Sequence, residues 1–184
     1  MAKLADVLAA VDALGFDPAR VKHVARRLSE AGKIPAGGPS RAPDLSEDDV
    51  LRLIVAVATS PKLRQAETSV ETYSGLTPVG AHIGSDAPAS VPRNAADAIA
   101  VEVEMARCGD AEARHSFLNF VRSWPEIVIE PPGGKIVRFR QAGANAAHWA
   151  HDGHRTATTI PVAAVADIFD ALFGRLRPAD GGSV

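Results

Sequence analysis

Apolar side chains near the start of the chain recur every three or four residues, a spacing that predicts two amphipathic helices. The first covers residues 3–14 and ends at Gly15, as expected of a C-cap glycine. The second begins after Asp17, its expected N-cap, with Pro18 at its first position. Because only residues 15–17 connect them, the two helices must turn sharply with respect to each other.

The third predicted helix has the clearest start in the chain. Ser46 is its expected N-cap, and three carboxylates follow in the first turn, where they favour the positive end of the helix dipole. Apolar residues then lie on nearly all sides of this helix, so we expect it in the centre of the core. Four more helices are predicted, over residues 60–74, 94–107, 111–122 and 161–176.

A β-hairpin is predicted in the second half of the chain, with strands at residues 126–130 and 135–140 on either side of a Pro-Pro-Gly-Gly turn. Residues 155–160 are expected to add a third strand. The Gly-, Pro- and Ser-rich residues 76–92 are interpreted as a linker. The expected fold class is therefore α+β. It has a helical domain at 1–75, the linker at 76–92, a small α+β module with the hairpin and a C-terminal helix at 93–177, and a disordered polar tail at 178–184.

The composition is that of an ordinary globular protein, with 184 residues, 46% hydrophobic and 23% charged, which excludes a disordered, collagen-like or coiled-coil chain. A single cysteine, Cys108, excludes an internal disulfide. No stretch approaches the roughly 20 apolar residues of a membrane span. Asp6 and Asp12 interrupt the first apolar run, so a signal peptide is not expected. We therefore expect a cytoplasmic protein without a membrane segment.

Charge is unevenly distributed along the chain. Residues 1–41 hold seven Lys or Arg against four Asp or Glu, a balance of +3, whereas the other 143 residues hold 13 against 18, a balance of −5. A basic end on an acidic protein indicates contact with a polyanion.

The second predicted helix concentrates this positive charge. Val21, Val24 and Leu28 form its apolar face, and long cationic side chains occupy the other positions, as a DNA-reading helix requires. Double-stranded DNA is therefore the predicted partner. Phosphate anchoring is assigned to Arg20, Lys22, Arg27 and Arg41, and base reading to His23 or Arg26. The full predicted DNA-binding set is Arg20, Lys22, His23, Arg26, Arg27, Lys33 and Arg41.

Residues 25–35, Ala-Arg-Arg-Leu-Ser-Glu-Ala-Gly-Lys-Ile-Pro, resemble the recognition helix and following turn of helix–turn–helix regulators and of DNA-binding proteins from prophages. The resemblance covers about residues 1–60. A helix–turn–helix head, helical middle and β-rich end also resemble small terminase subunits in layout. The leading hypothesis is a non-enzymatic DNA-binding protein, either a transcription regulator or a phage DNA-packaging accessory protein. Its α+β module at 93–177 is expected to form a homo-oligomer or to bind a partner protein.

A second hypothesis is a protein–protein adaptor or assembly factor without a nucleic-acid role. The predicted helices at 45–75 and 161–176 would then provide the interface, and the basic N-terminal region would be incidental. The pairing of two arginines separates the hypotheses. DNA binding is weakened if Arg26 or Arg27 pairs with Asp12, Asp17 or Glu30.

No catalytic pattern is present: GxSxG, Walker A, GxGxxG and HExxH are all absent, and we expect neither enzymatic activity nor a cofactor. His148, His151 and His154 are the candidates for a metal site, and a small metal-dependent enzyme is the third hypothesis. A polar loop is the favoured interpretation of these histidines.

Arg138 and Arg140 share one face of the predicted hairpin, with Lys135 nearby and Trp124 and Phe139 close in sequence. A basic strand face with an aromatic side chain can bind a nucleic-acid strand. A solvated sheet surface is the favoured interpretation of these residues.

Overall fold

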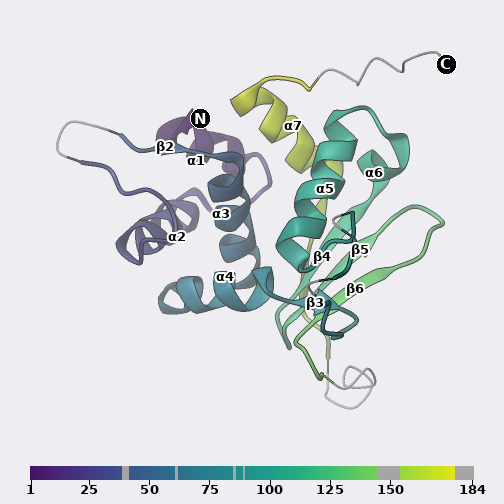
Figure 1. The fold of residues 1–184 in the computed structure, drawn as a ribbon. Helices are drawn as coiled ribbons and strands as arrows, with labels where there is room; N and C mark the ends of the chain where they lie inside the picture. Colours follow the sequence, from purple (N-terminus) through teal and green to yellow (C-terminus); the bar gives the residue numbers. More distant parts are fainter. Residues whose placement is uncertain (39–41, 61, 85, 89, 145–153, 177–184) are drawn as a thin grey trace.

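The computed structural model describes residues 1–184 except 39–41, 61, 85, 89, 145–153 and 177–184. The N-terminal part is helical (Figure 1). Its elements are β1 (Ala2–Lys3), α1 (Leu4–Asp12), α2 (Pro18–Glu30), β2 (Asp44–Leu45), α3 (Glu47–Thr59), the 3₁₀ turn η1 (Leu63–Gln65) and α4 (Ala66–Ser74).

Local side-chain chemistry explains where these helices start. The Asp17 carboxylate accepts the backbone N–H of Ala19, and Pro18 occupies the first turn of α2. At α3, the Ser46 hydroxyl accepts the Asp49 N–H while the Asp49 carboxylate accepts the Ser46 N–H, which is a reciprocal capping box. Both predicted N-caps are confirmed.

The loop that follows α2 returns to the N-terminus of the chain. β2 pairs antiparallel with β1, Ala2 opposite Leu45 and Lys3 opposite Asp44. A Lys3–Asp44 ion pair of 2.7 Å supports this register. In Figure 1, β2 lies on the same side of the molecule as α2.

A five-stranded antiparallel sheet forms the second part, in the order β3-β6-β5-β4-β7. Phe120, Ile127 and Phe139 lie side by side on the face that joins the core, and each is at most 2% exposed. The opposite, outer face carries the alternate residues, because side chains alternate across a strand. The strands are β3 (Thr77–Pro78), β4 (Phe117–Val121), β5 (Glu126–Glu130), β6 (Val137–Arg140) and β7 (Ala157–Pro161).

Helices α5 (Ala95–Arg107) and α7 (Val162–Phe173) pack against each other beside this sheet, and the short α6 (Ala111–His115) contacts both. One continuous hydrophobic cluster joins α1–α4 to α5, α7 and the sheet. Polar contacts cross the same boundary. The buried Tyr73 hydroxyl donates to the Val121 carbonyl, and the Thr158 hydroxyl donates to the Ala58 carbonyl at 3.1 Å. The helical part and the sheet part therefore share one core.

The predicted α+β class is confirmed, and the helices at 94–107 and 161–176 are close to their observed bounds. The helix predicted for 111–122 is wrong beyond residue 115, because residues 117–121 form the strand β4, which lies between β5 and β7. The helix predicted from residue 60 begins only at Ala66. The segment 76–92, interpreted as a linker, contains the edge strand β3. Within the described residues, no helix has both the length and the apolar character that crossing a membrane requires.

Candidate nucleic-acid interface

The outer side of α2 carries the basic residues that the sequence pattern placed there. Val21, Val24, Ala25 and Leu28 are buried against the domain core. Lys22, His23, Arg26 and Arg27 are exposed on the remaining faces of the helix. The expected division into an apolar inner face and a cationic outer face is therefore present.

Arg26 and Arg27 both pair with Glu30, which lies on the same helix. The Arg26 Nε donates to Glu30 Oε1 at 2.8 Å, and the Arg27 Nη1 donates to Oε2 at 3.0 Å. These two hydrogen bonds lower the pKa of the Glu30 carboxyl, so the carboxylate stays charged. Arg26 and Arg27 therefore have an acidic neighbour, and this pairing weakens the DNA-binding hypothesis.

The pairing nevertheless leaves both guanidinium groups accessible. The Arg26 and Arg27 side chains are 76% and 53% exposed. Ion pairs between exposed side chains on one helix contribute little to stability. A phosphate group can therefore replace Glu30 as the partner at small cost.

Two other predicted residues have tertiary partners. Arg20 Nη2 donates to the Ser60 carbonyl at the end of α3, which fixes this side chain against the helical core. Lys33 pairs with Glu71 and lies 3.9 Å from Glu67, both on α4, and the hydrogen bond to Glu71 raises the pKa of the lysine ammonium. Arg20 and Lys33 are therefore less available to DNA than the other predicted residues on α2.

Two basic residues that the sequence reasoning did not single out lie on the segment next to α2. Lys62 and Arg64 are exposed at η1, which contacts α2. Arg64 lines a hollow of about 150 Å³ together with Arg27, Glu30 and Glu67. The sequence offered no signal for this, because residues 62–64 lie more than 30 positions away from α2.

Comparisons with known proteins assign this chain to no family. The chain matches no protein-family model, no curated protein and no solved structure. The site is therefore interpreted from its own residues.

Several of the candidate residues lie outside the described part of the chain: Arg41 in the loop after α2, and His148 and His151 of the three histidines. His154 is described and exposed. Among the described residues, no three His, Cys, Asp or Glu side chains are grouped so that they could hold a metal ion.

The predicted basic strand face contains a buried carboxylate. Glu126 on β5 is only 1% exposed. Arg138 Nη1 donates to its Oε1 at 3.0 Å, and Arg140 Nε donates to its Oε2 at 2.7 Å. Arg155 Nη2 lies 3.8 Å from Oε1. Three guanidinium groups thus surround one carboxylate on the outer face of the sheet.

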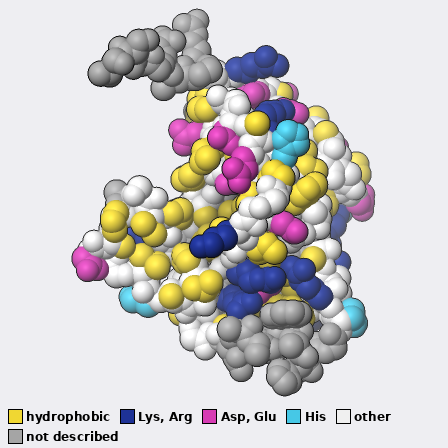
Figure 2. All heavy atoms as spheres, turned by 90° about the vertical axis from the view of Figure 1, so that its right-hand side faces the viewer, with side chains coloured by type: hydrophobic (Ala, Val, Ile, Leu, Met, Phe, Trp, Pro, Cys, Tyr) yellow, Lys and Arg dark blue, Asp and Glu magenta, His cyan; other side chains and the backbone are white. Residues whose placement is uncertain are grey.

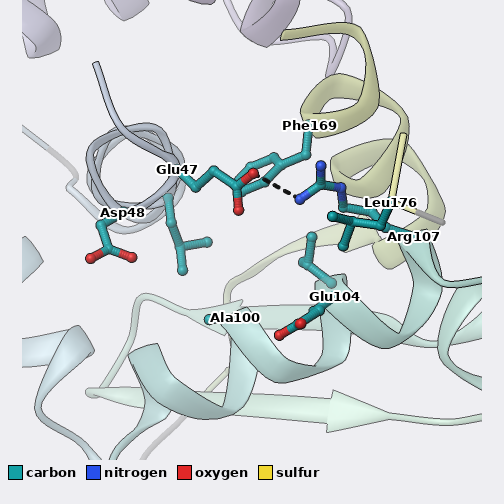
Figure 3. A pocket seen from close by; sticks show the side chains of 9 residues that line it. Glu47, Asp48, Ala100, Glu104, Arg107, Phe169 and Leu176 are labelled. Carbon is teal, nitrogen blue, oxygen red and sulfur yellow. Dashed lines mark hydrogen bonds and ion pairs between the residues drawn. The ribbon is translucent and has the colours of Figure 1, made fainter. Parts of the chain in front are cut away.

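A second hollow, of about 290 Å³, lies between α3, α5 and α7 (Figure 3). Arg107 lines this hollow, but its side chain is only 3% exposed. It donates to Asp170 and Glu47 at 2.9 Å each and to the Gly174 carbonyl at 2.8 Å. Burial opposes the charge of Arg107, but the hydrogen bonds to Asp170 and Glu47 outweigh burial and raise its pKa. Because its donors face protein acceptors, Arg107 is a structural tie between three helices.

Proposed function

We propose that this protein binds double-stranded DNA through the outer face of α2. The observation that carries the proposal is the accessibility of Lys22, His23, Arg26 and Arg27 on a helix whose opposite face is buried. A helix of 13 residues with this division fits the width of the major groove.

The arrangement of the neighbouring elements supports the same interpretation. α1 and α2 are joined by residues 13–17, the sharp connection of a helix–turn–helix unit. Residues 33–38 follow α2 directly, and the Ser29 hydroxyl of α2 donates to the Pro35 carbonyl at 3.0 Å, so a wing formed from this segment would begin beside the helix. Lys62 and Arg64 extend the basic surface of α2 onto the adjacent η1, where they can contact phosphates beside the groove.

Salt dependence provides the direct test. A labelled random duplex is titrated with the full chain over a salt series, and binding is followed by fluorescence anisotropy. Each phosphate neutralised contributes about 0.9 to the slope of log affinity against log salt concentration. We expect wild-type protein to bind with a steep slope and Lys22→Glu/Arg26→Glu to lose binding.

A matched control separates local contacts from overall charge. Lys135→Glu/Arg175→Glu makes the same change in net charge at two exposed positions outside α2. This control is expected to keep most of the duplex affinity. Equal loss in both double variants, or no wild-type binding at low salt, contradicts the proposal.

A protein–protein adaptor is the second candidate, and one observation favours it. Glu30 pairs with Arg26 and Arg27, while Glu67 and Glu71 flank Lys33, so acidic and basic groups are interleaved along this surface. Interleaved charges suit a protein partner better than a polyanion. Under this function the duplex experiment gives no binding for wild-type protein. Homo-oligomer formation stays a prediction, which light scattering of the same preparations tests.

A further inference from the structure

The hollow of about 290 Å³ between α3, α5 and α7 has an apolar floor (Figure 3). Leu51, Val103 and Phe169 form this floor, and each is at most 6% exposed. Ala100 and Leu176 add further apolar surface to the lining. Pockets for small ligands typically enclose about 300–1,000 Å³ and combine apolar walls with a few polar groups. The hollow is close to the lower end of this range, so it fits a small organic molecule.

Three carboxylates also line the hollow, and they come from two of the helices that border it. Glu47 and Asp48 belong to the first turn of α3, and Glu104 lies in the last turn of α5. All three residues are exposed. A carboxylate in the first turn of a helix stabilises the helix dipole, which explains Glu47 and Asp48. The same dipole disfavours a carboxylate in the last turn, so helix stability does not explain Glu104.

Arg107 is the one cation among the residues that line the hollow, and its donors are already engaged. Its Nη1 donates to Glu47 and its Nε donates to Asp170, at 2.9 Å each. Within the described part of the chain, the side chains of Asp48 and Glu104 form no hydrogen bond or ion pair. The lining therefore has more negative than positive charge, and two of its carboxylates are available to a ligand.

The charge of this region is opposite to that of the proposed duplex contact. Figure 2 shows several Asp and Glu side chains in the upper part of one side of the molecule, where Figure 1 places α6 and the end of α5. Lys and Arg side chains gather in the lower part of the same view. Negative charge at the hollow repels phosphate groups and attracts cations, so nucleic acid is not a suitable ligand for it.

We propose that the hollow between α3, α5 and α7 binds a small organic cation, an amine or amidine with an apolar body. The apolar body packs on Leu51, Val103 and Phe169, and the cationic group lies at the carboxylates, beside Glu104. A ligand of this class matches both parts of the lining, because its body removes apolar surface from water while its charge pairs with a carboxylate. The inference concerns a surface separate from α2 and does not depend on the duplex site.

The test compares three probes of similar shape on the full chain: the cation phenethylammonium, the neutral phenethyl alcohol and the anion hydrocinnamate. Backbone amide NMR shifts of isotope-labelled protein locate the binding site and give the dissociation constants. Shifts are expected at residues 47–51 and 100–107. Phenethylammonium should bind about tenfold more tightly than phenethyl alcohol, as expected for one charge-assisted hydrogen bond. Hydrocinnamate should not bind.

Three variants assign the contacts. Glu104→Gln should reduce the affinity for phenethylammonium several-fold and leave the affinity for phenethyl alcohol unchanged, because only the charge is lost. Ala100→Leu places a larger side chain in the lining and should weaken both probes. Glu112→Gln is the matched control, because it makes the same change of charge at an exposed position on α6 outside the lining, and it should leave both affinities unchanged.

Two further measurements keep the result interpretable. Duplex affinity should be the same in all three variants as in the wild type, so failure at this hollow is distinguishable from failure at α2. Thermal melts verify that the variants are folded. Ala100→Met replaces Ala100→Leu if the latter unfolds.

Three results overturn the proposal. The first is the absence of amide shifts around the hollow at the highest soluble concentration of phenethylammonium. The second is equal affinity for phenethylammonium and phenethyl alcohol, because the carboxylates then take no part in binding. The third is an equal loss of affinity in Glu104→Gln and Glu112→Gln, which would show a general attraction of cations to an acidic surface.

Discussion

The Arg107 guanidinium on α5 donates a hydrogen bond of 2.9 Å to the Glu47 carboxylate in the first turn of α3. The two residues are 60 positions apart in the chain, and the same guanidinium also binds Asp170 on α7. It lies 5.7 Å from the centre of the Phe169 ring as well. One buried cation thus ties together three helices from both halves of the chain.

Removal of this cation should destabilise the fold strongly. Arg107→Ala leaves Asp170, whose side chain is 16% exposed, without its partner, and breaking a buried ion pair costs about 3–5 kcal/mol. Urea unfolding measures the free energy of unfolding. Arg114→Ala is the control, because the Arg114–Asp167 pair of 2.8 Å lies at the surface and should contribute at most about 1 kcal/mol. Equal effects of the two variants contradict the role of Arg107.

Tyr73 should titrate at unusually high pH. It is the only tyrosine in the chain, so phenolate absorbance reports this group directly. Burial raises its pKa to about 12. The unfolded chain loses this proton near pH 10 while the folded protein keeps it. Folding stability from this group is therefore present below pH 10 and is lost as the pH rises from 10 to 12.

Comparison with Tyr73→Phe isolates this effect. The variant lacks the hydroxyl that donates to the Val121 carbonyl, and its free energy of unfolding at neutral pH should fall by about 1 kcal/mol. Between pH 10 and 12 the gap between the two proteins should shrink. A phenolate transition near pH 10 in the folded protein would show that the ring is solvated.

Glu30→Gln separates the two candidate functions. If α2 contacts phosphates, removal of the carboxylate frees Arg26 and Arg27, so duplex affinity should rise several-fold and the salt slope should steepen. Anisotropy over the salt series measures both quantities. Glu67→Gln, which removes an exposed carboxylate near Lys33, is the matched control and should have a smaller effect. An unchanged affinity for Glu30→Gln counts against DNA contact at this helix face.

The α3 capping box should contribute measurably to stability. Ser46→Ala removes the hydroxyl that accepts the Asp49 N–H, and loss of such a cap costs about 1 kcal/mol. Ser46→Asp supplies another oxygen acceptor and should retain most of the stability. Thermal or urea unfolding of the two variants provides the comparison, and an equal loss in both would argue against the cap.

Local chemistry by itself determined much of the helical part of this protein. Two helices start at caps formed by residues at most three positions apart: Asp17 with Pro18 at α2, and Ser46 with Asp49 at α3. Such local contacts can be predicted from the sequence. The cationic outer face of α2 was equally predictable, because helical period alone assigns residues to its faces. The five predicted basic residues on α2 therefore appeared on the expected helix.

Tertiary structure alone decided which of these charges are available. Arg20 and Lys33 find partners 40 and 38 positions away, at Ser60 and Glu71, and no local pattern encodes those distances. Residues 117–121, predicted to be helical, form a strand because they pair with β5 on one edge and β7 on the other. The burial of Glu126 among three arginines has the same origin, since side chains on separate strands meet only once the sheet has formed.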